Sequence, residues 1–413
     1  DTIRTLHARA AEWLERHGAI NEALRHALAA EDWTRTERLL ERVSTDHYEQ
    51  DRLAALCEVL QDVPTAVLER SPILALRLAW ARIRTGEFEL AERPLQIARD
   101  AIYDANDRSS LISLLILEAY HDLHENATNV IDLCNAALGL LGDDQPLEQA
   151  AALTIRGWAF MYTGESARAL DSFASVRQKN GYAPGTWTRL SEIAGSASVL
   201  VQRGMLEEAI ALLQSALPLD DRYASVLLAN IYLERNQLEE ADHCLQTAIG
   251  DFGDQSPLSL QSRIWLGMSR LAWARGDRIG ALQHIETAVG FALQMKSTRF
   301  LRQVLAQQAR FWIACDQTML AARWSEGGRL DLVSPQDHER QFEMLTYVRL
   351  LLHQGEINLS FDLLQQIDDL AERQERYGDL VEIRMLRAIA LTRTGDQKAA
   401  LAMFLTALDH GAS

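Results

Sequence analysis

The chain has 413 residues, of which 48% are apolar and 24% are charged, as is usual for a soluble folded protein. This length suits two or three domains, or one extended repeat array. The formal net charge of −17 repels nucleic acid and anionic lipid, which disfavours direct binding to either. Apolar runs such as LISLLILEAY, residues 111–120, are too short for a membrane span, and the first residues lack a signal-peptide pattern. We therefore expect a cytoplasmic protein, or part of one.

Residues 1–70 are predicted to form an N-terminal helical segment. Within it, LHARAAEWLERHGAINEALRHALAAEDWTRTERLLERV, residues 6–43, differs from the repeats that follow. We expect Trp13 and Trp33, which lie in this stretch, to be packing residues.

Residues 71–413 are predicted to form an array of repeats. A turn of the form Gly-x-x-x-x-Ala recurs, as in TGESARALDSF at residues 163–173. The turn positions, three of which replace Gly by another residue, are Gly86, Glu125, Gly164, Gly204, Asn236, Gly276, Asp316, Gly355 and Gly395. Their spacings are 39, 39, 40, 32, 40, 40, 39 and 40 residues, and a period this regular signals a solenoid.

Each repeat has the pattern of two helices, one on either side of the turn. Gly suits the left-handed end of a helix, Asn236 tolerates that conformation, and Asp316 does so less readily. Small residues recur seven positions before and five positions after the turn, where they let two helices approach closely. Prolines are expected to stop helices between hairpins at Pro146, Pro184, Pro218, Pro257 and Pro335. Since no stretch shows strand alternation, the predicted fold is all-α.

The turn and the small residue seven positions before it resemble the tetratricopeptide repeat (TPR), although the period is near 40 rather than 34 residues. This resemblance implies a right-handed superhelix of stacked helical hairpins with a concave groove.

Residues 6–43 and SPILALRLAWARIRTGEFELAERPL, residues 71–95, resemble the segment that follows the ATPase module in LuxR-type activators of the MalT kind. In that family an ATPase and a winged-helix connector precede a superhelical sensor, and a LuxR-type helix-turn-helix follows it. The resemblance implies that this chain is the middle of such a regulator, with the ATPase and DNA-binding domains as its missing partners. The sequence has no Gly-x-x-x-x-Gly-Lys-Ser/Thr loop, and no cofactor is predicted. In the best-known member of the family the effector is a small sugar.

A candidate ligand site follows from the repeat. In arrays of this type the first helix of each hairpin faces inward, at positions thirteen, ten, six, three and two before the turn. At the position six before the turn, three consecutive repeats have arginine, whose guanidinium group binds phosphate or carboxylate bidentately. The predicted ligand-binding residues are Arg270, Arg310, Arg349, Trp273, Arg263, Trp158, Tyr162 and Asn230.

An alternative interpretation is structural. The arginines would then pair with acidic residues of adjacent helices, such as Glu343 and Glu382, and the aromatic residues would belong to the core. Catalysis and metal binding are not predicted, because the sequence has neither a Gly-x-Ser-x-Gly elbow nor HExxH spacing. His121 and His124 are expected to be solvated polar residues. We expect small buried side chains at Cys57, Cys134, Cys244 and Cys315.

The sequence thus predicts an effector-sensing and protein-interaction domain of a MalT-like, ATP-dependent transcription activator, and not an enzyme. A small inducer would bind in the concave groove, and the arginine row points to an anionic inducer. The alternative function is a TPR-like scaffold that holds a protein or peptide partner. In a further alternative, the inducer binds elsewhere and the array only relays the signal.

Overall fold

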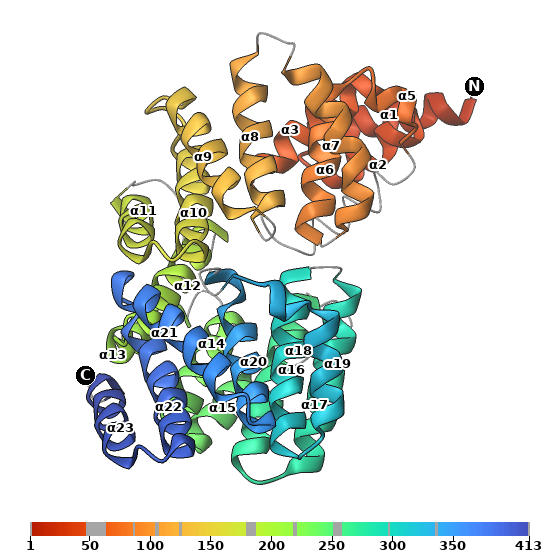
Figure 1. The fold of residues 1–413 in the computed structure, drawn as a ribbon. Helices are drawn as coiled ribbons and strands as arrows, with labels where there is room; N and C mark the ends of the chain where they lie inside the picture. Colours follow the sequence, from red (N-terminus) through yellow and green to blue (C-terminus); the bar gives the residue numbers. More distant parts are fainter. Residues whose placement is uncertain are drawn as a thin grey trace. The chain divides into compact units, whose positions relative to one another are not determined.

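In the residues that it describes, the structure, a computed structural model, is built of helices (Figure 1). It describes residues 2–46, 63–85, 87–103, 107–123, 126–178, 187–217, 221–250, 258–295, 298–334 and 338–411. Every regular element in these ranges is helical, which confirms the all-α prediction. None of their helices has both the length and the apolar content needed to cross a membrane.

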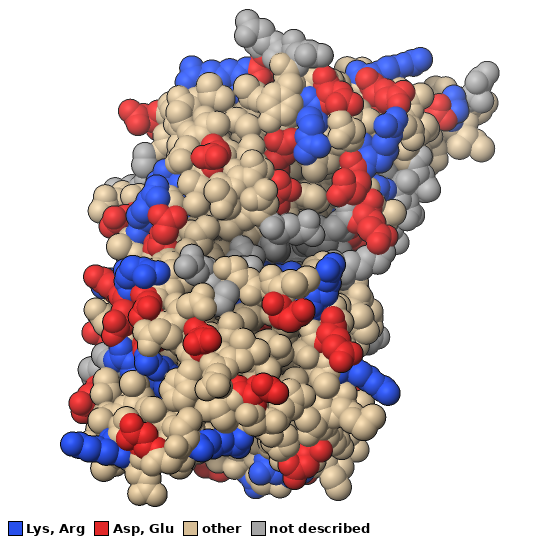
Figure 2. All heavy atoms as spheres, in the orientation of Figure 1, with Lys and Arg blue, Asp and Glu red and all other residues tan. Residues whose placement is uncertain are grey.

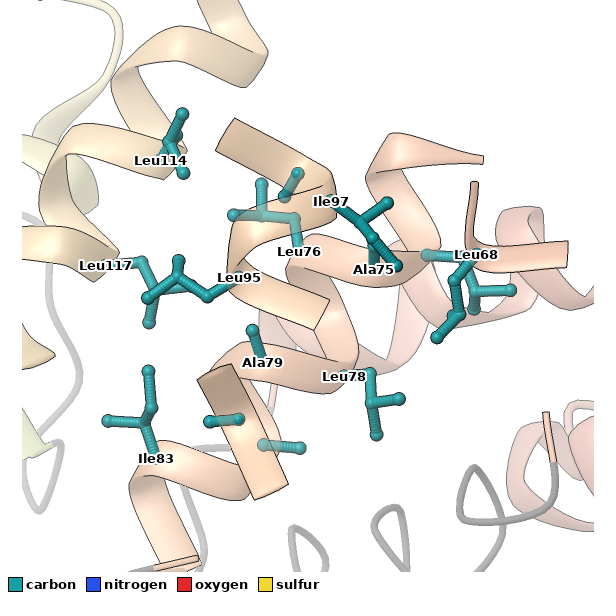
Figure 3. Close-up of a cluster of buried hydrophobic side chains, with 14 of the residues drawn as sticks. Leu68, Ala75, Leu76, Leu78, Ala79, Ile83, Leu95, Ile97, Leu114 and Leu117 are labelled. Carbon is teal, nitrogen blue, oxygen red and sulfur yellow. The ribbon is translucent and has the colours of Figure 1, made fainter. Parts of the chain in front are cut away.

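The chain divides into two compact units, residues 1–121 with 136–142, and residues 122–135 with 143–413. The first unit contains α1 (Thr2–Arg16), α2 (Ile20–Ala29), α3 (Trp33–Asp46), α5 (Thr65–Leu68), α6 (Pro72–Thr85), α7 (Phe88–Ile102) and α8 (Arg108–Asp122). Its core includes Leu78 of α6, Leu95 of α7 and Leu117 of α8, each at most 2% exposed (Figure 3). The domain boundary predicted near residue 70 stays a prediction.

The second unit consists mostly of helical hairpins. α9 (Ala127–Leu140) crosses the division between the units. The unit continues with α10 (Pro146–Tyr162), α11 (Ser166–Gln178), α12 (Trp187–Gln202), α13 (Leu206–Gln214), α14 (Asp221–Glu234), α15 (Leu238–Ile249), α16 (Leu258–Ala274) and α17 (Arg278–Gln294). It ends with α18 (Thr298–Ala314), α19 (Thr318–Gly327), the 3-10 helices η1 (Leu330–Leu332) and η2 (His338–Arg340), α20 (Gln341–Gln354), α21 (Ile357–Arg373), α22 (Tyr377–Thr394) and α23 (Gln397–Gly411).

The predicted turns form as left-handed helix ends. All seven turn positions within the described residues have positive φ, between 56° and 88°, including Asn236 and Asp316. After each of them, a backbone N–H donates to the carbonyl five residues earlier, as Asp277 N does to Ala272 O at 2.9 Å. The predicted turns at Gly86 and Glu125 lie outside the described residues. The turn chemistry therefore ends each first helix and starts its partner.

Small residues let the two helices of a hairpin pack closely, as predicted. Ala169, Ala209, Ala241, Ala281 and Ala321, each five residues after a turn, are all fully buried. Pro146 occupies the first turn of α10, whereas Pro184, Pro218, Pro257 and Pro335 lie outside the described residues. The second unit is thus an array of TPR-like hairpins.

The array of the second unit closes on itself, because α12 contacts α22. Arg203 Nη2 donates to Glu375 Oε2 at 2.6 Å, although the two residues are 172 positions apart. A Cβ atom added to Gly378 would lie only 2.4 Å from the backbone oxygen of Val201. We call this contact, between residues 201–204 and residues 375–378, the seam.

Polar side chains are buried beside the seam. Arg376 has no exposed surface, and its guanidinium group donates to Gln341 Oε1 and to Asp379. His338 of η2 lies next to Gln341 and to the backbone of Met161 in α10. Elements that are far apart in the sequence therefore share one polar cluster.

The surface carries both signs of charge. On the face shown in Figure 2, basic and acidic side chains are interspersed rather than gathered into broad patches of one sign.

Candidate functional site on the inner face of the second unit

The candidate site lies on the first helices of the hairpins. These helices pack on one another, α12 on α14, α14 on α16, α18 on α20 and α20 on α22. We call the surface that they share the inner face. Side chains at the predicted position six before the turn reach from one first helix to the next, as the following contacts show.

Arg310 of α18 and Arg349 of α20 share the carboxylate of Glu382, which lies on α22. Arg310 Nη2 lies 2.8 Å from Glu382 Oε1, and Arg349 Nη2 donates to the same oxygen at 3.1 Å. Arg310 Nε also donates to Thr346 Oγ1 at 2.9 Å, and its guanidinium carbon lies 3.9 Å from the ring centroid of Phe342. One carboxylate thus serves two guanidinium groups. This is the pairing with Glu382 that the structural interpretation anticipated.

Arg270 of α16 binds two residues of α14. Its Nη1 donates to Asn230 Oδ1 at 3.1 Å, and its Nη2 donates to Glu234 Oε1 at 2.5 Å. Asn230 and Glu234 also line a small cavity of about 180 Å³ between α12 and α14. The arginine row therefore continues to the edge of a cavity.

The charges of this row influence one another. Burial lowers the pKa of Arg310, as do the charges of Arg349 and Arg270, while Glu382 counteracts them. Burial alone would raise the pKa of Glu382, but Arg310 and Arg349 hold it below its usual value. Glu382 is therefore ionised at neutral pH. Among the described residues, the three guanidinium groups of this row form ion pairs with two carboxylates, those of Glu382 and Glu234.

Two nitrogens of this row, Arg310 Nη2 and Arg349 Nε, are buried without a hydrogen-bond partner in the described part of the chain, although Arg310 Nη2 lies at ion-pair distance from Glu382. The Nε atom of Arg349 is buried and donates to no described residue. A buried guanidinium donor without a partner is costly, so the site has capacity for one more acceptor.

Two predicted site residues of α16 pack against aromatic rings. Trp273 stacks on Phe311 with centroids 4.4 Å apart, within a hydrophobic cluster. The guanidinium carbon of Arg263 lies 4.9 Å from the ring centroid of Phe300. Neither contact places Trp273 or Arg263 next to Glu382.

The other two predicted residues belong to α10. Trp158 Nε1 donates to the backbone oxygen of Ser191 at 3.2 Å, and its ring lies 5.8 Å from that of Tyr162. Tyr162 is 8% exposed, and Arg299 of α18 lies over its ring. These aromatic residues connect α10 to other helices of the unit. A ligand-binding role for them stays a prediction.

Three residues of the site were not predicted from the sequence. Glu234 occupies the position two before its turn, which the repeat pattern already places on the inner face, so that pattern could have found it. Thr346 and Arg299 lie at positions without a repeat signal, and only their packing reveals them.

The described residues include free cysteines but no group of side chains suited to a metal ion. Cys134 is buried, Cys244 and Cys315 are half-buried, and all three are free thiols, while Cys57 lies outside the described residues. His121 Nε2 lies 3.4 Å from Glu92 Oε1, a distance at which a protonated imidazole forms an ion pair. His124 also falls outside the described residues. Among those that are described, no three His, Cys, Asp or Glu side chains cluster in a way that could hold a metal ion.

The paired helices, left-handed turns and buried small residues define a TPR-like helical-repeat protein. The sequence profile of the MalT-like TPR region matches residues 123–413, more than half of the chain, and the chain belongs to this family. The HTH-type transcriptional regulator MalT of Serratia proteamaculans is similar at 24% identity, over 91% of this chain and 43% of that protein. The serine/threonine-protein kinase PknK of Mycobacterium tuberculosis is 37% identical over 81 residues, 20% of this chain and 7% of that protein. The chain thus spans less than half the length of these curated relatives.

Solved structures share the fold. A Rap protein complexed with Competence and Sporulation Factor superposes with a TM-score of 0.59 at 14% identity, over 83% of this chain and 98% of that one. The Rap conjugation gene regulator of the plasmid pLS20, in complex with the Phr* peptide, gives 0.53 at 13% identity, over 84% and 96%. The chain is therefore a MalT-like TPR scaffold.

Proposed function

We propose that this chain is the effector-sensing and protein-interaction part of a MalT-like, ATP-dependent transcription activator, and that it binds a small anionic inducer on the inner face. The inducer would contact Arg270, Arg310 and Arg349, and the ATPase and LuxR-type DNA-binding domains of that activator would respond to its binding. The observation that carries the proposal is the sharing of Glu382 by Arg310 and Arg349. It leaves positive charge in excess inside a protein whose net charge is −17.

The closure of the second unit supports a small molecule. Because α12 contacts α22, the first helices form a closed arrangement rather than an open strip. The cavity of about 180 Å³ at Asn230 and Glu234 also has room for a small apolar group of a ligand. Membership in the MalT-like family supports a regulatory role.

A thermal-shift screen tests the proposal. The 413-residue chain would be heated with citrate, pyrophosphate and sugar phosphates, and with neutral sugars, at constant ionic strength. An anion at a hundred times its dissociation constant should stabilise the fold by about 2.7 kcal/mol. The shift should vanish in Arg310→Ala and persist in Arg373→Ala, which removes an exposed arginine of the outer helix α21. Equal shifts in both variants would place the anion elsewhere.

A peptide-binding scaffold is the second candidate. The Rap regulator of pLS20, which shares the fold, was solved in complex with the Phr* peptide. If peptides of five to ten residues stabilise the chain, small anions do not, and Arg310→Ala keeps the effect, this candidate replaces the first.

A further inference from the structure

The cavity between α12 and α14 has one apolar side and one polar edge. Val201, Leu213, Leu227 and Ile231 supply apolar walls. Its volume, about 180 Å³, is close to that of an apolar cavity of about 150 Å³ that can hold a benzene ring. The cavity can therefore take an apolar group of about six carbons.

The polar edge of the cavity leads directly to the arginine row. Asn230 and Glu234 line the cavity and both accept hydrogen bonds from Arg270. The positive charge of Arg270 also acts on Arg310. Burial lowers the pKa of Arg310 most, and the charges of Arg349 and Arg270 lower it further. An apolar pocket and a cationic row thus meet at one residue, Arg270.

We infer that the inducer is a small amphipathic anion, whose apolar group fills this cavity and whose anionic head binds Arg270 beside Arg310. This inference rests on the proposed function and names its ligand class. A neutral sugar is a poor fit, because its hydroxyl groups would face Val201, Leu213 and Leu227 without hydrogen-bond partners.

The ion pair between Arg270 and Glu234 does not prevent binding. The side chain of Glu234 is 60% exposed, so it can turn into solvent when a ligand carboxylate takes its place on Arg270. Ion pairs this exposed contribute little to stability, and the exchange keeps the charge of Arg270 balanced. Glu234 therefore acts as a stand-in for the anionic head.

Calorimetric titration of the 413-residue chain with straight-chain carboxylates tests the inference. Acetate, butyrate, hexanoate, octanoate and decanoate would be compared below their micelle concentrations. Each methylene that enters the cavity should tighten binding about fourfold, the equivalent of about 0.8 kcal/mol. The gain should stop near six to eight carbons, when the cavity is full. Hexanol, which has the chain but no charge, should bind more weakly than hexanoate, and Arg270→Gln should remove that difference.

A matched pair of variants shows where the alkyl chain of the carboxylate binds. Ser198 lies on α12 at the cavity, and its Oγ donates to the carbonyl of Ala194 at 2.8 Å. Ser198→Leu should fill the cavity, so that affinity no longer depends on the length of the alkyl chain while acetate still binds. If leucine impairs folding, the smaller Ser198→Val should reduce this length dependence in part. Ser175 of α11 makes the same bond to Asp171, also at 2.8 Å, so Ser175→Leu serves as the control and should leave every affinity unchanged.

The outcomes separate this inference from the proposed function. If citrate binds in an Arg310-dependent way but carboxylate affinity is independent of chain length, the inference fails and the proposed function stands. If the affinity still depends on the length of the alkyl chain in Ser198→Leu, the inference also fails, since the alkyl chain then binds elsewhere. If no anion binds at all, the proposed function and the inference both fail.

Discussion

Glu382 is the single carboxylate on which Arg310 and Arg349 both depend. Glu382→Gln keeps the shape of the side chain and removes its charge, which leaves two neighbouring guanidinium groups without their counter-ion. Loss of one partner from a fully buried ion pair costs about 3–5 kcal/mol, and the partial exposure of Arg349 reduces this to about 2–3 kcal/mol. Urea unfolding at pH 7 measures the loss.

The same variant distinguishes a ligand site from a purely structural cluster. If the row binds anions, phosphate should stabilise Glu382→Gln more than the wild type at equal ionic strength, because it replaces the missing carboxylate. Equal stabilisation of both proteins would assign the arginines to structure alone. Arg310 and Arg349 lower the pKa of Glu382 in the folded protein. The contribution of this carboxylate to the free energy of unfolding is therefore fully present above about pH 4.3 and is lost as the pH falls further.

At the scale of elements, the seam depends on a residue without a side chain. Gly378→Ala would place a Cβ atom 2.4 Å from the backbone oxygen of Val201, and a backbone atom cannot turn aside as a side chain can. We expect a destabilisation of about 1–3 kcal/mol, as for other overpacked sites. Hydrogen exchange should become faster at residues 199–204 and 376–382 and stay unchanged in α16 and α17.

A second helical glycine provides the control. A Cβ atom added to Gly290 of α17 would meet no heavy atom within 4 Å. Gly290→Ala should therefore be neutral or stabilise the helix by up to about 1 kcal/mol, because alanine favours helix over glycine. If Gly378→Ala behaved in the same way, the close contact at the seam would be wrong.

The elements differ in how well the sequence predicts them. The turn at Gly276 and the buried Ala281 were predictable, because turn chemistry and helix contact are local and recur with the period. The contact of Arg203 with Glu375 was not, since it arises from the accumulated rotation of many stacked hairpins. Glu375 itself adopts a left-handed φ of 56°, which its residue type does not suggest.

The candidate site was predictable to a similar extent. The period alone places Arg270, Arg310 and Arg349 on one face, and the sequence also offers Glu382 on an adjacent first helix as a partner for them. The cavity at Asn230 could not be foreseen, because it is the space left by the packing of side chains such as Leu213 and Leu227. A repeat pattern specifies which face a residue lies on, but not how well neighbouring side chains fill the space between helices.

At the scale of the second unit, the polar cluster beside the seam sets the ionisation state of His338. Burial, followed by the charges of Arg376 and Arg299, lowers the pKa of His338 to about 3. An unfolded histidine has a pKa of about 6.5, so between pH 6.5 and pH 3 the unfolded chain binds a proton at this residue that the folded chain does not. The free energy of unfolding must therefore fall as the pH falls through this range, by at most about 1.4 kcal/mol per pH unit from this residue.

His338→Gln removes this proton uptake while keeping a polar side chain next to Gln341 and Met161. Urea unfolding of the whole chain between pH 7.5 and pH 4.5 should show a shallower loss of stability in the variant than in the wild type. The pKa of Asp379 is raised, by burial in the first place, which gives a slope of the opposite sign, but both proteins keep that carboxyl group. His243→Gln, at an exposed position of α15, controls for the change of residue type. If the curve of His338→Gln ran parallel to that of the wild type, the histidine would be solvated, and η2 would not pack against α10 as closely as the closed array requires.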